Sequence, residues 1–358
     1  MDGMNICKLI TLLCFSLLTC SSVQAQTAGK TESLDHADNQ KNEGNINWKL
    51  ATLGGTQFWT DVRVVGGWRI QRNSYFGHFR LLDNEEVRQA WGKENACVKE
   101  LEKNLKAGVI QPYSGKVVIL LHGLCRSWRS MQGMEEHLKS QGYTVLNFRY
   151  ASSRQQVDQH AYYLKRVISE LPSEVSEINF VGHSLGNIVV RHYVADCGKS
   201  KSPDLDTRIN RMVMLGPPNQ GSRMARIVKD SVSFKLIAGA SGAQLSFGWD
   251  ELNKNLATPE FEFGIIAGGY GDDDAPWSNI LLPGRDDFTV SEWETMLPGA
   301  DDFLVKPLLH TTMMHQEEVY SATTRFLEKG YFTASDQKKP IDSLPENPRE
   351  LRESKSAK

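Results

Sequence analysis

A serine lies between two glycines at residues 182–186, which read Gly-His-Ser-Leu-Gly. The apolar run 177–181 before it is typical of a buried strand, and the run 185–197 after it has apolar residues at helical spacing. A strand that turns at once into a helix strains the backbone at its apex, and the flanking glycines remove side chains that would collide. The pattern G-x-S-x-G also occurs by chance in loops. The strand predicted before it and the helix predicted after it are what favour a functional serine here. We predict a nucleophile elbow that exposes the hydroxyl of Ser184 at a helix N-terminus.

A serine hydroxyl is a poor nucleophile unless a base takes its proton and an acid orients that base. On a strand-to-helix turn of this kind the three residues follow the chain order serine, acid, histidine. Of the nine histidines, His310 and His315 lie late enough in the chain. His310 directly follows the predicted last strand, where a base is expected, whereas His315 opens the predicted final helix as a surface residue. We therefore expect His310 to be the base.

The acid is less well defined by residue type. The Asp272–Asp274 cluster lies in a turn-like run typical of a solvated loop, and Asp301 and Asp302 immediately precede the last strand, which they are expected to cap. Asp286 and Asp287 precede a short stretch of alternating apolar residues, as expected for an acid-bearing loop. Residue type and spacing do not decide between these two.

An activated serine also needs two backbone amides that face the developing oxyanion. One is expected from Leu185, directly after the nucleophile, and the other from the loop 122–128 that follows the first predicted strand of the sheet. Gly123 lets that loop turn inward, so the amide of Leu124 is the candidate donor. We expect His122 and His183 to have structural roles, since both precede the serine.

Six short apolar runs alternate with amphipathic stretches between residues 111 and 332, which we assign to one domain. We predict strands at 116–123, 143–150, 177–182, 209–216, 261–268 and 302–310, and helices at 127–142, 155–171 and 185–197. This order predicts an α/β fold, a mostly parallel sheet with helices on both faces. Ligands bind at the carboxyl ends of the strands in such sheets, and Ser184 falls at that end.

Residues 48–110 form a predicted N-terminal extension. The run 56–83 indicates a β-hairpin or meander that covers the edge of the main sheet, and 84–108 has helical periodicity and ends in glycine. The residues expected to cover that edge are Trp59, Val62, Val64, Trp68 and Ile70.

The two ends of the chain differ from the rest in composition. Lys8, the apolar stretch Leu9–Leu18 and the small residues up to Ala25 predict a signal peptide at 1–25 that directs export. An alternative is lipoprotein cleavage before Cys20, although the threonine before that cysteine is unusual for it. Residues 26–47 are polar and aperiodic, as in a flexible linker, and 333–358 are charged and proline-punctuated, as in a disordered tail.

Neither the net charge nor the cysteine spacing is typical of a nucleic-acid-binding protein or of a zinc protein. The 358 residues carry a formal net charge of −2, which gives no indication of a nucleic-acid partner. Outside the predicted signal peptide the cysteines are Cys97, Cys125 and Cys197. Their spacing does not suit a zinc site, and three cysteines permit one disulfide with one thiol left over. We favour buried structural cysteines and leave the pairing open.

Four motifs in order, LLHGL at 120–124, GHSLG at 182–186, LGPPNQGS at 215–222 and LLHTTMM at 308–314, resemble the bacterial lipase and esterase branch of the α/β-hydrolase superfamily. The resemblance covers roughly residues 115–330 and leaves out the N-terminal extension. It implies that the acid lies in a D-G-x-V segment. The matching residues are Asp287–Val290, which favours Asp287 over Asp286, although Phe288 replaces the glycine.

A run of about 223–256 is inserted between two core strands. The resemblance implies a short helical lid that covers the pocket and supplies an apolar acyl-binding wall, whereas packing on the sheet is the alternative. The apolar residues concerned are Met224, Ile227, Val228, Phe234, Leu236 and Ile237, with Leu124, Trp128 and Met131 as further candidates for the wall.

These residues predict a serine hydrolase that cleaves carboxylic esters, with an apolar acyl group, through Ser184, His310 and Asp287 and with no metal or organic cofactor. The expected partner is a small-molecule or lipid ester, with membrane-surface contact in the lipid case. An acyltransferase or thioesterase would use the same residues. A non-catalytic envelope binding protein on the same fold is the alternative of another class, and oligomeric state stays open.

Overall fold

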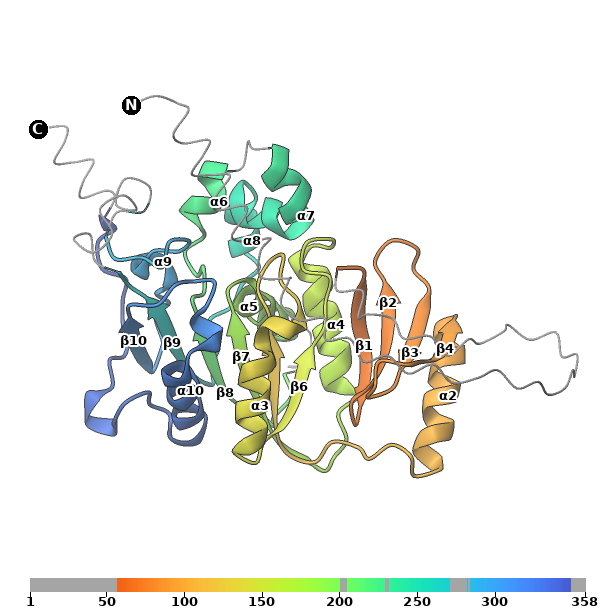
Figure 1. The fold of residues 1–358 in the computed structure, drawn as a ribbon. Helices are drawn as coiled ribbons and strands as arrows, with labels where there is room; N and C mark the ends of the chain where they lie inside the picture. The colour runs from red at the N-terminus through yellow and green to blue at the C-terminus, as the bar shows by residue number, and fades with distance from the viewer. Residues whose placement is uncertain (1–56, 200–204, 229–231, 271–281, 283, 349–358) are drawn as a thin grey trace, which may run out of the picture.

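The computed structural model describes residues 57–199, 205–228, 232–270, 282 and 284–348 (Figure 1). The predicted signal peptide, its alternative cleavage site at Cys20, and the linker lie outside these residues. Side chains are described for all of these residues except 228 and 232–237.

The centre of the molecule is a six-stranded sheet in which every neighbouring pair is parallel, in the order β10-β9-β8-β7-β5-β6. Its strands are β5 (Gly115–Leu121), β6 (Thr144–Phe148), β7 (Val175–His183), β8 (Ile209–Leu215), β9 (Glu262–Gly268) and β10 (Asp302–Lys306). Each is rich in branched or aromatic apolar residues, which suit a sheet buried on both faces. The predicted α/β fold is confirmed.

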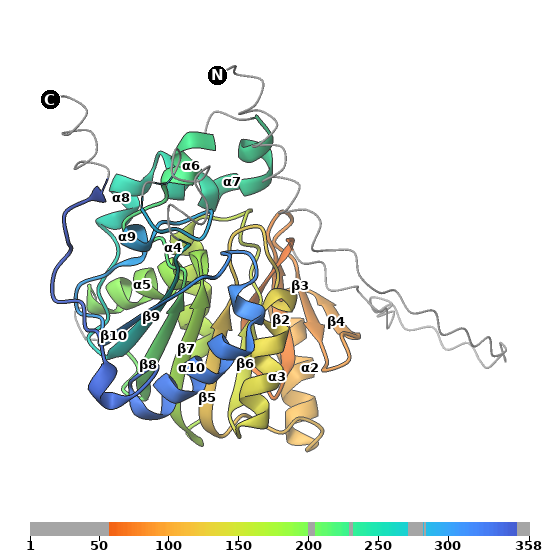
Figure 2. The same cartoon turned by 60° about the vertical axis from the view of Figure 1, so that its left-hand side comes forward.

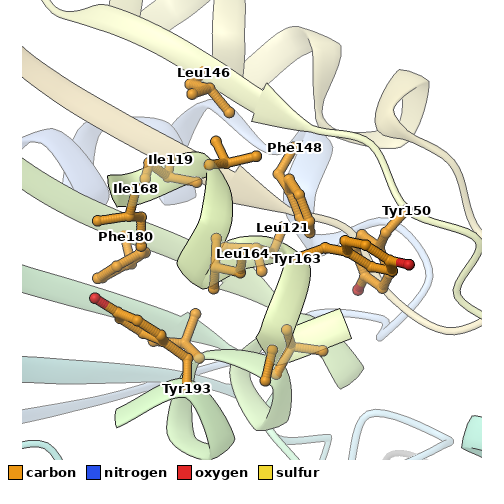
Figure 3. Packing of buried hydrophobic residues seen from close by; sticks show 14 of the residues in the cluster. Ile119, Leu121, Leu146, Phe148, Tyr150, Tyr163, Leu164, Ile168, Phe180 and Tyr193 are labelled. Atoms are coloured by element: carbon orange, nitrogen blue, oxygen red, sulfur yellow. The ribbon is translucent and has the colours of Figure 1, made fainter. Parts of the chain in front are cut away.

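Helices cover both faces of this sheet. In β5, Val118 and Leu120 pack toward α3 (Gln132–Ser140) and α10 (Glu317–Lys329), and the alternate residues of the strand pack toward the other face. On that face α4 (Val157–Ser169) and α5 (Leu185–Gly198) complete a second core. Figure 2 shows α3 and α10 in front of the sheet and α4 and α5 behind it, and Figure 3 shows part of the second core, where Ile119, Leu121 and Phe180 pack with Leu164 and Tyr193.

The N-terminal extension is an antiparallel four-stranded meander followed by one helix. Its elements are β1 (Trp59–Val65), β2 (Trp68–Asn73), β3 (Phe79–Leu82), β4 (Arg88–Gly92) and α2 (Glu94–Lys106). The prediction of a helix over 84–108 was wrong in its first part, because β4 pairs with β3 and buries Ala90 opposite Leu81. The carboxylate of Asp83 accepts hydrogen bonds from the amides of Glu85 and Val87, which makes the turn into β4.

The extension covers the β6 edge of the parallel sheet, as expected. The amide of Asp61 in β1 donates to the carbonyl of Arg149, just after β6, at 2.8 Å. Val62, Val64 and Ile70 belong to the same buried cluster as Leu146 and Phe148 of β6. The two sheets therefore share one hydrophobic core.

The insertion after β8 forms three helices, α6 (Arg223–Val228), α7 (Val232–Ser246) and α8 (Trp249–Asn253). They lie above the carboxyl ends of the parallel strands (Figure 1). Trp249 and Leu252 of α8 join the buried core, so this part of the insertion packs on the domain. In α7, the amide of Ala240 donates to the carbonyl of Ser153 at 3.1 Å.

The remaining elements are short: α9 (Glu292–Thr295) and 3₁₀ turns at Trp128–Met131, Met313–His315 and Ser335–Gln337. Residues 333–348 pack on the domain, so the prediction of a disordered tail was wrong for them. Ile341 is buried and forms a bridge with Ala300, and the indole of Trp293 donates to the carbonyl of Pro345 at 2.9 Å. No helix among the described residues is long and apolar enough to cross a membrane.

The three cysteines outside the predicted signal peptide form no disulfide with one another in the structure. Cys97 and Cys197 are buried and Cys125 is partly exposed. Burial raises the pKa of the Cys97 thiol to about 12, which suits a structural cysteine.

Candidate active site

Ser184 lies between the last residue of β7 and the first residue of α5, at φ 52° and ψ −119°. This is the strained turn that the sequence predicts, and it depends on both glycines. A Cβ on Gly182 would lie 2.3 Å from Oδ1 of Asn187, and a Cβ on Gly186 would lie 2.5 Å from the carbonyl oxygen of Leu121. No larger residue fits at either position without moving a neighbour.

The elbow is fixed to the end of β8. The amide of Ser184 donates to the carbonyl of Leu215 at 2.9 Å. The side-chain amide of Asn187, which is fully buried, donates to the carbonyls of Ser184 and Leu215 at 3.1 and 3.3 Å. Sequence reasoning did not single out Asn187; a polar residue three positions after the nucleophile, within an apolar helical run, is the signal that could have found it.

His310 and Asp287 meet in a buried pair. Nδ1 of His310 lies 2.7 Å from Oδ2 of Asp287, and the other oxygen of that carboxylate accepts from the amides of Thr289 and Val290 at 3.0 and 2.7 Å. Both side chains are buried. Because a carboxylate only accepts, this contact selects the neutral imidazole tautomer with its proton on Nδ1, which has a lone pair on Nε2.

Asp286 points elsewhere, so the two candidate acids are distinguished by geometry. One of its carboxylate oxygens accepts from the amide of Phe288 at 2.7 Å, and its backbone pairs with that of Tyr270. Phe288 has φ 70° where the resembling pattern has glycine, and its ring stacks on that of Tyr270 with centroids 5.3 Å apart. The left-handed conformation is therefore kept here without glycine.

The other acid candidates lie away from His310. Oδ2 of Asp301 accepts from the amide of Phe263 near the start of β9, and Oδ1 of Asp302 accepts from the amide of Phe303 at the start of β10, each at 2.9 Å. Asp272–Asp274 lie outside the described residues.

His310 packs against His183, which precedes the elbow serine, and against Gly216 after β8. Nε2 of His183 is 2.9 Å from the carbonyl oxygen of His310, and the two rings are 4.8 Å apart. A Cβ on Gly216, the residue after Leu215, would lie 3.0 Å from Nδ1 of His310. In the part of the chain that the structure describes, His310 thus contacts the residue before Ser184, and the side chains of Ser184 and His310 are not hydrogen-bonded to each other.

The loop after β5 passes directly over the elbow. A Cβ on Gly123 would lie 3.2 Å from Cβ of Ser184 and 2.8 Å from Nδ1 of His183, so only glycine allows this approach. Leu124 is the next residue, and Leu185 is the first residue of α5, whose amide has no acceptor within the helix. Both candidate oxyanion donors therefore belong to backbone that adjoins Ser184.

Burial keeps two other histidines near the site neutral. His122 and His183 are buried, and burial lowers the pKa of His122 to about 4 and that of His183 well below its ordinary value. Nδ1 of His122 is 2.9 Å from the carbonyl oxygen of Gly123. His315 is exposed at the end of a 3₁₀ turn, two residues before α10 begins, so the predicted final helix starts later than expected.

Part of the expected pocket wall lies elsewhere. Met131 is fully buried in the core beneath α3, and the ring of Trp128 stacks with the guanidinium of Arg149 at 4.1 Å. Among the described residues, no three histidine, cysteine, aspartate or glutamate side chains gather as a metal ion would require.

Residues 130–226 match a family model described as alpha/beta hydrolase of unknown function (DUF915). No curated protein matches the chain at a significant level. Among solved structures, the mature lipase BlEst2 of Bacillus licheniformis is 15% identical, with a TM-score of 0.44 over 59% of this chain and 90% of that one. A gene product of Listeria innocua is 18% identical, with a TM-score of 0.44 over 65% of this chain and 100% of that one.

Phospholipase PlaB of Legionella pneumophila is 19% identical, with a TM-score of 0.39 over 51% of this chain and 45% of that one. At identities and TM-scores this low, these likenesses decide nothing about the site or its substrate.

Proposed function

We propose that this chain, which has the fold of the α/β-hydrolase superfamily, is a serine hydrolase that cleaves carboxylic esters. The observation that carries the proposal is the buried pair of Asp287 and His310, which lies against His183, the residue before a strained serine at the end of a central parallel strand. A binding protein has no need of a serine at φ 52° or of an oriented imidazole beside it.

In the first step, Nε2 of His310 takes the proton of the Ser184 hydroxyl as its oxygen attacks the ester carbonyl. Asp287 keeps the imidazole in the required tautomer and stabilises the imidazolium that forms. The imidazolium then gives its proton to the leaving alcohol, which leaves an acyl-enzyme. Water repeats the sequence on the acyl group and releases the acid. The first step needs the hydroxyl of Ser184 within hydrogen-bond reach of Nε2 of His310, and catalytic contacts of this kind often form only with substrate bound.

The amides of Leu124 and Leu185 hold the oxyanion. Their contribution is large because the backbone around them is fixed before the reaction begins, and loss of one such donor costs roughly 3 kcal/mol in transition-state stabilisation. A glycine at position 123 is what lets the first of these amides approach the serine.

An apolar acyl group suits the surroundings of the site. The insertion helices lie above the carboxyl ends of the strands, and Phe247, between α7 and α8, is 67% exposed. Leu309, the neighbour of the base, is 37% exposed. Exposed apolar side chains on the insertion and next to the base are consistent with binding of an apolar group.

The test is the replacement Ser184→Ala, with Ser140→Ala as the matched control. Ser140 is an exposed serine on α3, where its hydroxyl donates to the carbonyl of His137 and accepts from the side-chain amide of Gln141. We expect Ser184→Ala to abolish p-nitrophenyl ester hydrolysis and fluorophosphonate labelling, while Ser140→Ala keeps both. Persistence of either signal in Ser184→Ala would overturn the assignment.

The export of the chain is also part of this proposal, and its support is the sequence of residues 1–25 alone. The mass of the protein recovered from the producing cell tests it. A mature chain that begins at Gln26 supports signal-peptide cleavage, one that begins at a lipidated Cys20 supports anchoring, and an intact chain in the cytoplasm contradicts both.

A further inference from the structure

The loop 122–128 is held mainly from outside. Its own turn is closed by a backbone bond from Arg126 to Gly123 at 3.2 Å and contains Cys125 at φ 58°, a conformation that costs on the order of 1 kcal/mol for a residue other than glycine. Three of its carbonyls accept hydrogen bonds from side chains that lie outside it. These bonds are Tyr150 Oη to His122, Gln57 Nε2 to Arg126 at 2.6 Å, and Asn147 Nδ2 to Trp128 at 2.9 Å.

Gln57 connects this loop to a second one. While its Nε2 donates to the carbonyl of Arg126, its Oε1 accepts from the hydroxyl of Ser153 at 2.8 Å and from the amide of the same residue at 3.3 Å. One side-chain amide thus joins the loop that follows β5 to the loop that follows β6. Gln57 itself belongs to neither, since it lies two residues before β1 of the N-terminal extension.

β1 itself holds the second loop, which follows β6. The fully buried carboxylate of Asp61 accepts from the amide of Arg149 at 2.9 Å and from the side-chain amide of Gln71 at 2.8 Å, and it pairs with Arg69. The hydroxyl of Thr60 accepts from the amide of Ala151 at 3.2 Å. A charged group this well satisfied and buried holds its partners in one arrangement.

We propose that Gln57 is a positioning residue, through which the N-terminal extension sets the orientation of the Gly123–Leu124 peptide that faces Ser184. The proposal rests on the proposed function, since it assigns the extension a part in binding the oxyanion. Without Gln57 the loop keeps its turn but loses the bond that fixes the turn at Arg126. Misplacement of a donor by a fraction of an ångström weakens the transition state more than the bound substrate.

The experiment compares Gln57→Ala and Gln57→Glu with Gln111→Ala in the full chain. Gln57→Glu keeps the acceptor for Ser153 but removes the N–H that binds Arg126. Gln111 is the matched control, because it directly follows the extension, is exposed, and donates to the carbonyl of Gly108 at 3.2 Å. Each variant is assayed for kcat and KM on a p-nitrophenyl ester, for melting temperature, and for hydrogen–deuterium exchange in peptides that cover 122–128.

We expect both Gln57 variants to lower kcat about tenfold with KM within about twofold, since the interaction lost acts in the transition state. Exchange should rise in 122–128 in both variants, and also at Ser153 in Gln57→Ala, which loses the acceptor for that amide. Gln111→Ala should match the wild type. An unchanged kcat in both variants, or exchange that rises throughout the chain, would overturn the inference. Wild type and Ser184→Ala are measured in parallel. If the wild type shows no hydrolysis that depends on Ser184, the proposed function is wrong and so is this inference. If the wild type is active and the Gln57 variants match it, only the inference about Gln57 is wrong.

Discussion

Acid should destabilise this protein through histidines buried beside the candidate site. The ring of Tyr150 lies between two of them, with centroids 4.2 Å from His122 and 4.7 Å from His160. Burial lowers the pKa of His122 to about 4 and that of His160 to about 3. Both imidazoles are therefore neutral in the folded protein at pH 5 and above.

The sign of the effect follows from proton binding. In the unfolded chain a histidine titrates near pH 6.5, so between about pH 6.5 and 4 the unfolded state binds protons that the folded state does not. Stability is therefore constant above this range and falls as the pH drops through it. For His160 alone the slope is about 1.4 kcal/mol per pH unit, which amounts to roughly 2 kcal/mol between pH 7 and pH 5.

The assay is urea unfolding, followed by tryptophan fluorescence, of the wild type and His160→Leu at pH 7 and pH 5. Other groups that titrate in this range are common to both proteins, so their effects cancel in the difference. We expect His160→Leu to lose about 2 kcal/mol less than the wild type on acidification. The control is Leu164→Ala, on the same helix and fully buried, which should lose about 2–5 kcal/mol equally at both pH values.

Equal losses for the wild type and His160→Leu on acidification would refute the reasoning. That result would mean that the imidazole of His160 takes up a proton in the folded protein, and that the cluster around Tyr150 is open to water.

Two further predictions concern the site. Asp287→Asn should lower kcat on p-nitrophenyl esters about 10³- to 10⁴-fold, because an amide no longer fixes the tautomer of the base, whereas Asp286→Asn should stay within about tenfold; the reverse order in initial rates would reassign the acid. Gly186→Ala should cost about 1–3 kcal/mol or more in unfolding free energy, since its Cβ would lie 2.5 Å from the carbonyl oxygen of Leu121. Thermal melts of the two variants check this. Gly198→Ala, at the open end of the same helix, should not lower the melting temperature, and equal melting temperatures for Gly186→Ala and Gly198→Ala would contradict the packing argument.

The sequence was sufficient wherever local pattern decides the structure. Six apolar runs predicted six strands within a few residues, because strands buried on both faces need continuous apolar sequence. The turn at Ser184 was predictable because two glycines leave few alternatives there.

Local sequence pattern did not predict structure that depends on contacts between residues distant in the chain. Residues 88–92 have spacing compatible with a helix, yet they form β4 because β3 offers a partner strand. Ile341 follows a charged run typical of disorder, yet it is buried against Ala300. The choice of Asp287 over Asp286 depends on which of two adjacent carboxylates faces a histidine 23 residues further along, and no spacing rule contains that direction.

The sharing of one core by the two sheets has a consequence for how the protein can be divided. β6 is the outermost strand of the parallel sheet, and its far side is covered by β1. A shortened chain starting at residue 111 would leave that strand with unpaired amides and carbonyls beside bare Leu146 and Phe148, an open edge to which other copies can add. The extension is thus no detachable module: the whole chain should melt in a single cooperative transition, and the shortened form should aggregate.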